Sequence, residues 1–506
     1  MATSEFLNDT SKWLRHKIML QKLNNPLGYV FIVTFSILLG LLIGATGIKT
    51  GALMLGALMA LPVLFLILAD LQIGLVLILV VAFLTNLLAK IGDYPVGIAL
   101  DALAYFMLFA IFIRQIKERN WDFINNPISF MIIIWITYSM MMALNPEGHV
   151  KAWLYSVRAM AGLIIIFFIA LYAFSSLERI KFMFKVILFL SFLAALYGLK
   201  QEWIGFEDWE MAWLRANERR WLLIVQWGRV RVFSIFSDPT TMGIPMVYMS
   251  VFCVIMATAP IKLWKRITLL VFAASMLLCM GYGGSRTPVV LIPIGFLFYI
   301  ILTLQRRIMM FAGVGLLLFF FIMLKDSSNP VLYRLQSAFR SNDASVQVRL
   351  DNQRLIQPYI QSHPFGSGLG TTGILGQRFR PDSWLSYFAH DSGFVRVAVE
   401  MGWIGLIIYM ALLFKILQTG IYYYLRVRDP VIKTMYLAIN CLIFILIVAS
   451  YPQEIIILLP TSIIFYMCTA AIIRLKDFDP AFQALAETNK KGVEVIQVEE
   501  EEIRVD

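Results

Sequence analysis

A histidine lies at the start of a long apolar run late in the chain. The stretch FAHDSGFVRVAVEMGWIGLIIYM, from Phe388 to Met410, places His390 and Asp391 directly before residues that resemble a membrane span, and the chain has only 4 histidines. The pKa of an imidazole lies near neutrality, so His390 can exchange a proton with a reacting group or bind a diphosphate. It can equally be a structural hydrogen-bonding group, and the spacing leaves these roles open.

Two arginine-bearing stretches precede other apolar runs. GRVRVFSIFSDPTTMG carries Arg229 and Arg231, and the short turn GYGGSRTPVV carries Ser285 and Arg286. A guanidinium group can hold a diphosphate through two parallel hydrogen bonds. An arginine at a membrane interface can also reach lipid phosphates without any part in chemistry.

A third polar stretch, SVQVRLDNQRLIQPYIQSHPFGSGLGTTG, combines arginines with closely spaced glycines. Arg349 and Arg354 fit an amphipathic helix, and we expect one here. The glycine-rich run that follows contains Gly368 and Gly370, which we treat as candidate substrate-binding positions. It lacks the strand before and the helix after that a phosphate-binding loop needs, so an ordinary flexible turn is the simpler interpretation.

The composition indicates what must position these residues. The 506-residue chain is 60% hydrophobic and 15% charged, with a mean hydropathy of +0.77. Long uncharged runs without strict alternation predict an all-α polytopic membrane protein and argue against a β-barrel. The net charge of +11 suits anionic lipid or phosphate-bearing substrates, whereas nucleic acid is disfavoured because no basic soluble domain is present.

Hydropathy predicts about 14 transmembrane helices. They are expected near residues 28–47, 51–69, 71–89, 97–113, 128–144, 155–174, 183–199, 241–259, 267–282, 288–304, 308–324, 399–418, 432–450 and 455–473. Lys and Arg accumulate on alternate connections, which predicts that both termini lie in the cytoplasm. The four cysteines fall inside these spans and are expected to be packing residues rather than disulfides or ligands.

The same pattern divides the chain into three parts. Residues 1–27 are expected to form a cytoplasmic or interfacial segment, 28–476 a single membrane domain, and 477–506 an acidic cytoplasmic tail. The membrane domain carries two long outer connections, 200–240 and 325–398. The candidate arginines and the histidine all fall near span ends on this outer side. Together they predict an outer-facing cavity lined by cations and one imidazole.

Three motifs between residues 225 and 420 carry a resemblance to a known family. They are Arg231-x-x-Ser234-x-Phe236-x-Asp238-Pro239; Gly284-Ser285-Arg286; and Arg349 followed by His363-Pro364-Phe365-Gly366-x-Gly368-Leu369-Gly370, His390-Asp391 and Glu400-x-Gly402-x-x-Gly405. This combination resembles the O-antigen ligase and polymerase superfamily of bacterial envelope glycosyltransferases. Ser234 stands where glycine is commoner in that family, and Asp391 where asparagine is commoner.

The resemblance implies a C-type glycosyltransferase fold in the bacterial inner membrane. Its donor would be a glycan on undecaprenyl diphosphate, and its acceptor a lipid or a glycan at the outer face. The acceptor hydroxyl would displace the lipid diphosphate with inversion at the anomeric carbon. Arg231 and Arg286 would offset charge on the leaving group and His390 would act as base or as diphosphate ligand. The remaining candidates for binding are Arg229, Arg349, Arg354, Asp391, Ser285, Gly368 and Gly370.

We expect no metal and no cofactor. Arginines can offset the charge that a metal ion would neutralise in other enzymes, and the first outer connection carries no acid. Glu207-Asp208-Trp209-Glu210 is the one dense acidic cluster outside, for which a solvated or acceptor-facing role is favoured over cation binding.

Several functions share these features. A ligase and a polymerase of lipid-linked repeat units use the same donor chemistry, and a protein O-oligosaccharyltransferase is a third version. A lipid-linked glycan flippase or transporter belongs to another class. Flippases usually show two similar halves, whereas the polar outer connections of this chain are placed asymmetrically.

Overall fold

A computed structural model describes most of the chain, in two compact units. The described residues are 62–92, 96–160, 162–226, 228–325, 336, 344–388, 390 and 392–484, with isolated positions between 26 and 44. The first unit covers Met1–Leu75 and the second Val76–Asp506. In the first unit the structure describes a helix over residues 62–69, Asp70 and the first turn of α4. The second unit carries every candidate residue.

Helices dominate the described residues. The long helices are α4 (Leu71–Ile91), α5 (Val96–Glu118), α6 (Pro127–Met141), α7 (Val150–Met160), α8 (Ile165–Ala173), α9 (Leu177–Trp203), α12 (Pro239–Met256), α13 (Leu263–Gly283), α14 (Arg286–Thr303), α15 (Arg306–Leu324), α17 (Ala344–Ser362), α19 (Gly393–Arg426), α20 (Pro430–Ala449) and α21 (Thr461–Arg474). The short helices are η2 (Asp122–Ile124), η3 (Met142–Leu144), η4 (Gly162–Ile164), α10 (Asp208–Arg215), α11 (Glu218–Ile224), α18 (Gly373–Phe379), η6 (Trp384–Tyr387), η7 (Ile455–Ile457) and η8 (Leu475–Phe478). An antiparallel hairpin joins β1 (Val225–Gln226) to β2 (Arg229–Val230).

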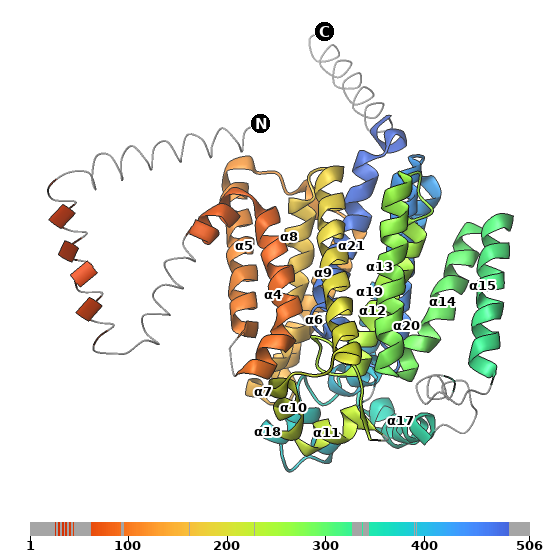
Figure 1. Cartoon of the computed structure of the whole chain (residues 1–506). Coiled ribbons are helices and arrows are strands. Elements are labelled where there is room, and N and C mark those ends of the chain that lie inside the picture. Colours follow the sequence, from red (N-terminus) through yellow and green to blue (C-terminus); the bar gives the residue numbers. More distant parts are fainter. Residues whose placement is uncertain are drawn as a thin grey trace, which may run out of the picture. The chain divides into compact units, whose positions relative to one another are not determined.

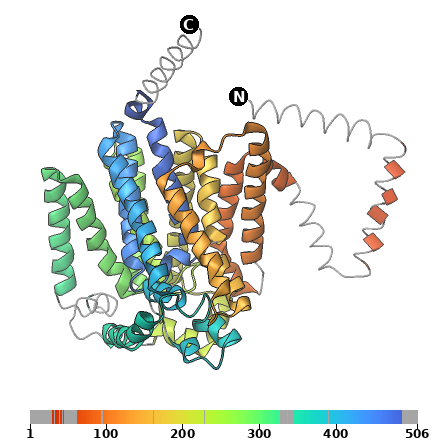
Figure 2. The same cartoon turned by 180° about the vertical axis from the view of Figure 1, so that it is seen from behind.

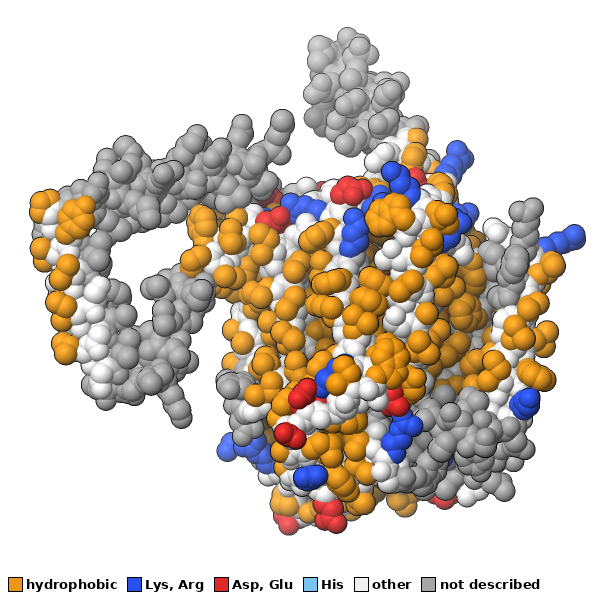
Figure 3. Space-filling model, in the orientation of Figure 1, with side chains coloured by type: hydrophobic (Ala, Val, Ile, Leu, Met, Phe, Trp, Pro, Cys, Tyr) orange, Lys and Arg blue, Asp and Glu red, His pale blue; other side chains and the backbone are white. Residues whose placement is uncertain are grey.

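The expectation of an all-α polytopic membrane protein is confirmed. Within the described ranges, 10 helical segments are long and apolar enough to cross a membrane. Apolar side chains cover the middle of the helices, and charged side chains gather at their two ends (Figure 3). The figure of about 14 spans stays a prediction, because much of 28–47 and 51–69 lies outside the described residues.

Two of the expected spans differ in detail from the structure. The span expected over 155–174 is built from α7, η4 and α8, so its helix is interrupted by a 3-10 turn. The span expected over 455–473 begins with η7, and its α-helix starts only at Thr461, after Pro460. Proline has no backbone N–H and favours the first turn of a helix, which fits this late start.

Two almost fully buried helices form the interior of the second unit. Nearly all of α12 is buried, and it packs against α9, α13, α14 and α20. The shorter α21 is buried along its length and contacts α8, α19 and α20. By contrast, most residues of α5 and α13 are not buried, as expected of helices that face lipid.

The polar connections gather at one end of the second unit. Helices α10, α11, α17 and α18 lie together at the lower end in Figure 1, and the view from behind agrees (Figure 2). Alternation along the chain places the starts of α12, α14 and α19 and the end of α20 at this same end. The helix expected around Arg349 and Arg354 is confirmed as α17. The described parts of the two outer connections therefore contain several helices.

Candidate functional site

His390 makes a close pair with a carboxylate from a distant part of the chain. It lies just before the first residue of α19, and its Nδ1 is 2.9 Å from Oε1 of Glu454, which lies between α20 and η7. Both side chains are largely buried, with 15% and 16% of their surface exposed. Packing of α19 against α20 brings the two residues together.

The pair continues into a buried chain of alternating charges, here called the His390 network. Arg396 lies between two carboxylates: its Nη1 is 2.7 Å from Oε2 of Glu454, and its Nε is 3.4 Å from Oε2 of Glu400. Glu400 is fully buried and accepts a hydrogen bond of 2.5 Å from Oγ1 of Thr372. Each buried charge thus has an opposite charge or a hydrogen-bond donor, as burial requires.

The network sets the protonation chemistry of His390. Burial alone would lower the pKa of His390, but the hydrogen bond and charge of Glu454, with the charge of Glu400, more than offset it and raise the pKa above its ordinary value. Burial likewise opposes ionisation of Glu454, yet His390 and Arg396 hold the pKa of Glu454 below its usual range. A carboxylate on Nδ1 selects the tautomer that carries its proton there and leaves Nε2 as the acceptor in the neutral ring.

Nε2 of His390 is the polar atom of the network that has no hydrogen-bond partner among the described residues. It lies under the first residue of α18: a Cβ built on Gly373 would be 3.6 Å from Nε2. Only the backbone of Gly373 lies over this nitrogen there, because glycine has no side chain.

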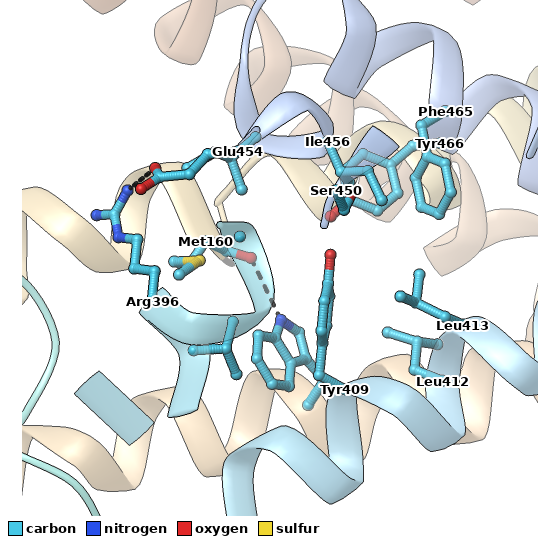
Figure 4. A pocket seen from close by; sticks show the side chains of 14 residues that line it. Met160, Arg396, Tyr409, Leu412, Leu413, Ser450, Glu454, Ile456, Phe465 and Tyr466 are labelled. Atoms are coloured by element: carbon cyan, nitrogen blue, oxygen red, sulfur yellow. Dashed lines mark hydrogen bonds and ion pairs between the residues drawn. The ribbon is translucent and has the colours of Figure 1, made fainter. Parts of the chain in front are cut away.

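On its inner side the network borders a small apolar cavity. Figure 4 shows the Arg396–Glu454 ion pair at one side of it, and Tyr409, Leu412 and Leu413 among the other lining residues. The cavity measures about 30 Å³, room for about one water molecule. An apolar floor of this kind strengthens the charge interactions of the network because it excludes bulk water.

The glycine motifs join the segment before α18 to the backbone of α19, which carries Arg396 and Glu400. The backbone N–H of Ser367 donates to the carbonyl oxygen of Val399 (2.9 Å), and that of Gly368 donates to the backbone carbonyl oxygen of Glu400 (2.9 Å). Gly402 has φ +72° and interrupts the helical conformation of α19, where a Cβ would lie 1.9 Å from the carbonyl oxygen of Pro364. Only glycine fits such a position.

The two candidate glycines pack closely in a folded segment. A Cβ on Gly368 would lie 2.6 Å from Cα of Gly148, and a Cβ on Gly370 would lie 2.6 Å from the carbonyl oxygen of Ala152. The flexible turn favoured for this run is therefore wrong, since the run is buried against the segment that leads into α7. A direct contact of Gly368 or Gly370 with substrate stays a prediction.

A second set of candidates surrounds the starts of α12 and α14. Arg231 is only 9% exposed, and its Nε donates to the carbonyl oxygen of Gly283 (2.9 Å) at the end of α13. Arg286 is the first residue of α14, and the hydroxyl of Ser285 before it is 2.7 Å from that of Thr240. The contact between Arg231 and the α13–α14 turn brings both arginines to one place. Helix α20 packs against α12 and α14 of this set and against α19, which follows His390.

Buried polar side chains bind the backbone of the segment that follows Arg231. Ser234 has φ +51°. Its N–H donates to Oε1 of Gln201 (2.7 Å), and its carbonyl oxygen accepts from Nζ of Lys90 (2.9 Å). Gln201 in turn donates to Glu210 (2.6 Å), which is fully buried. The left-handed conformation explains why glycine suits position 234. In this chain serine occupies position 234, and its hydroxyl donates to the carbonyl oxygen of Ala194 (2.5 Å).

Ser234→Gly is expected to change the free energy of unfolding by less than about 1 kcal/mol, since the lost hydrogen bond is offset by relief of a strained conformation. Ser234→Val is expected to cost about 2 kcal/mol or more, because a β-branched residue is poorly tolerated at positive φ. Thermal unfolding in detergent measures both. Ser191→Val, at a buried helical serine of α9, is the matched control, and an equal loss there would contradict the explanation.

The other candidates lie outside these two sets. Arg229 pairs with Glu202, and Arg354 is 80% exposed and pairs with Asp351 at 3.7 Å. The side chain of Arg349 and the whole of Asp391 fall outside the described residues. Roles for all four in substrate binding stay predictions.

The solvated or acceptor-facing role expected for the acidic cluster is wrong for its last residue. Glu210 is buried, and it accepts hydrogen bonds from Gln201 and from Tyr197 (3.0 Å). It also receives the backbone N–H of Glu207 (2.8 Å) as part of a capping box that starts α10. Over the ranges described, no group of three or more His, Cys, Asp or Glu side chains is placed to hold a metal ion.

Two residues of the His390 network escaped the sequence reasoning. Glu454 lies in a short connection with no motif, so only the packing of α19, α20 and α21 reveals it as the partner of His390. Arg396 had a usable signal: it stands four residues before Glu400 in the stretch FVRVAVEM, a spacing that places both side chains on one face of a helix.

The fold and the site define a multi-pass, all-α membrane protein with a buried histidine–carboxylate pair and an arginine set at one end. Residues 269–410 match the family model described as O-antigen ligase. A protein of Salmonella muenchen named O-antigen polymerase is 23% identical over 337 residues, which is 62% of this chain and 80% of that protein. The resemblance to the O-antigen ligase and polymerase superfamily is thereby confirmed.

Proposed function

We propose that the protein is a glycosyltransferase of the O-antigen ligase type. It moves a glycan from undecaprenyl diphosphate to an acceptor at the outer face of the bacterial inner membrane, with both termini in the cytoplasm. The observation that carries the proposal is the buried His390–Glu454 pair, at the same end of the molecule as Arg231 and Arg286. The family match over residues 269–410 supports the same class.

His390 acts as the general base in this proposal. Its Nδ1–H donates to Glu454, and its Nε2 takes the proton of the acceptor hydroxyl as that oxygen attacks the anomeric carbon. The bond between the anomeric carbon and the diphosphate oxygen breaks in the same step, so the configuration inverts. Because Nε2 lies beneath Gly373, α18 has to shift for the acceptor to reach it.

Arg231 and Arg286 serve the leaving group. The lipid diphosphate gains negative charge as the glycosidic bond breaks, and fixed guanidinium groups offset that charge without a metal ion. Contact of Arg231 with Gly283 fixes its orientation before the donor binds. Such preorganisation is the main source of electrostatic catalysis.

A polymerase that joins lipid-linked repeat units is the second candidate. The relative named O-antigen polymerase favours it. The donor chemistry is identical, so the acceptor decides between the two functions. Purified protein offered core lipid and lipid-linked repeat units as separate acceptors will extend one of them. Transfer to core lipid supports the ligase, and transfer only to repeat units replaces it with the polymerase.

Glu454→Gln tests the role of the histidine. Loss of the carboxylate lowers the pKa of His390, so the acid limb of kcat/KM against pH moves to lower pH and the maximum rate falls about 10-fold or more. Glu147→Gln is the matched control, because Glu147 pairs with His363 (3.5 Å) at the same end of the molecule. A profile in which activity instead falls as pH rises through the pKa of His390 would show that the protonated ring binds diphosphate.

A further inference from the structure

A large cavity opens at the end of the molecule opposite the candidate site. It measures about 840 Å³ and lies between α9, α12, α13 and α20. Helices α9, α13 and α20 begin at this end, and α12 ends here. In the proposed orientation it faces the cytoplasmic leaflet of the membrane.

The rim of this cavity is positively charged. Lys181, Lys185 and Lys265 line it, against a single acid, Glu178. Glu178 pairs with Lys181 at 3.0 Å, so it offsets one of the three positive charges. Two positive charges are therefore left in excess. Trp264, also on the rim, is 62% exposed, as is common for tryptophan at a membrane interface.

The interior of the cavity is apolar. Away from the lysines it is lined by aromatic and aliphatic side chains from all four helices. They include Phe184, Leu188, Phe252, Met256, Phe272 and Met435. The cavity opens between helices whose outer faces are apolar, so its contents are in contact with the hydrocarbon of a bilayer rather than with water.

We propose that this cavity binds one anionic phospholipid, with its phosphate at the three lysines and an acyl chain among the aromatic residues. A phosphate that carries a net charge fits the excess positive rim, and a chain fits an apolar interior of this size. A zwitterionic lipid would leave the excess lysine charge uncompensated, and free phosphate would leave the apolar part unused. The bound lipid would contact α9, α12, α13 and α20 at once.

Native mass spectrometry of the delipidated, full-length protein tests the proposal with three probes. Phosphatidylglycerol is expected to bind about 10- to 100-fold more tightly than phosphatidylcholine, and inorganic phosphate is expected not to be retained. The triple variant Lys181→Gln/Lys185→Gln/Lys265→Gln should lose that preference. Lys262→Gln/Lys433→Gln/Lys476→Gln removes the same charge at the same end outside the cavity, and should keep it.

A fourth variant separates the cavity from surface charge. Thr268 lines the cavity, and Thr268→Trp fills it without changing charge, so binding of phosphatidylglycerol should fall about 10-fold. Equal losses in the two lysine triples, or unchanged binding in Thr268→Trp, would overturn the proposal in favour of unspecific attraction to the basic surface. Equal binding of phosphatidylcholine would overturn it in favour of a chain-binding groove without charge selection.

Discussion

His390→Ala is expected to reduce the rate of glycan transfer by about 10²- to 10⁴-fold, the usual contribution of a positioned general base. The substitution removes Nε2, the polar atom of the His390 network that has no hydrogen-bond partner among the described residues. It also leaves Arg396 paired with both Glu454 and Glu400, so neither carboxylate loses its last cationic partner. The rate with purified donor and acceptor at saturating concentrations measures the effect.

His363→Ala provides the control for this loss. His363 also lies at the outer end and pairs with a glutamate, Glu147, but its side chain is 33% exposed and stacks on Tyr359. We expect less than about a fivefold effect there. If the two alanine variants lose activity equally, the loss reflects general damage to the outer segment and His390 is not the base.

Arg396→Met is expected to cost about 3–5 kcal/mol in the free energy of unfolding, because it leaves the buried Glu400 without its cation and Glu454 with His390 alone. Glu400 is fully buried, and Arg396 is the residue that lies between it and Glu454. The methionine matches the length and flexibility of the arginine stem, so the packing loss is small by comparison. Thermal unfolding in detergent, followed by near-ultraviolet circular dichroism, measures the change.

Arg354→Met is the matched control for that substitution. Arg354 is also an arginine paired with an acid on its own helix, but it is 80% exposed. Exposed pairs contribute little, so its unfolding temperature should stay near that of the wild type. A similar loss in both variants would mean that the buried network does not stabilise the fold.

The membrane architecture could be predicted from the sequence because the bilayer constrains it strongly. Runs of about 20 apolar residues have few alternatives to a spanning helix. The described helices α4, α13, α14 and α20 follow the expected ranges closely, whereas α5 and α9 extend beyond theirs by several residues. The interruptions inside the spans were less predictable. The break between α7 and α8 and the late start of α21 after Pro460 are local features that a hydropathy average over a whole span does not resolve.

The candidate site could be predicted in its parts but not in its connections. Motif residues identified His390, Arg231 and Arg286, whereas Glu454 lies in an unremarkable connection and enters the site only through the packing of α19 on α20. Ser234 shows the converse. Serine stands there where glycine is commoner, and only the structure shows its hydroxyl donating to the carbonyl oxygen of Ala194 and its backbone bound by Lys90 and Gln201.

The most direct test of the account is the fate of the lipid diphosphate. Purified protein in detergent with EDTA is given undecaprenyl-diphosphate-linked glycan together with each acceptor, and released undecaprenyl diphosphate and glycosylated acceptor are measured in the same samples. We expect the two products to appear in equal amounts with the wild type and to be nearly absent with His390→Ala. A donor that stays intact with every acceptor, while the protein moves it across reconstituted membranes, would contradict the proposed function and identify a transporter.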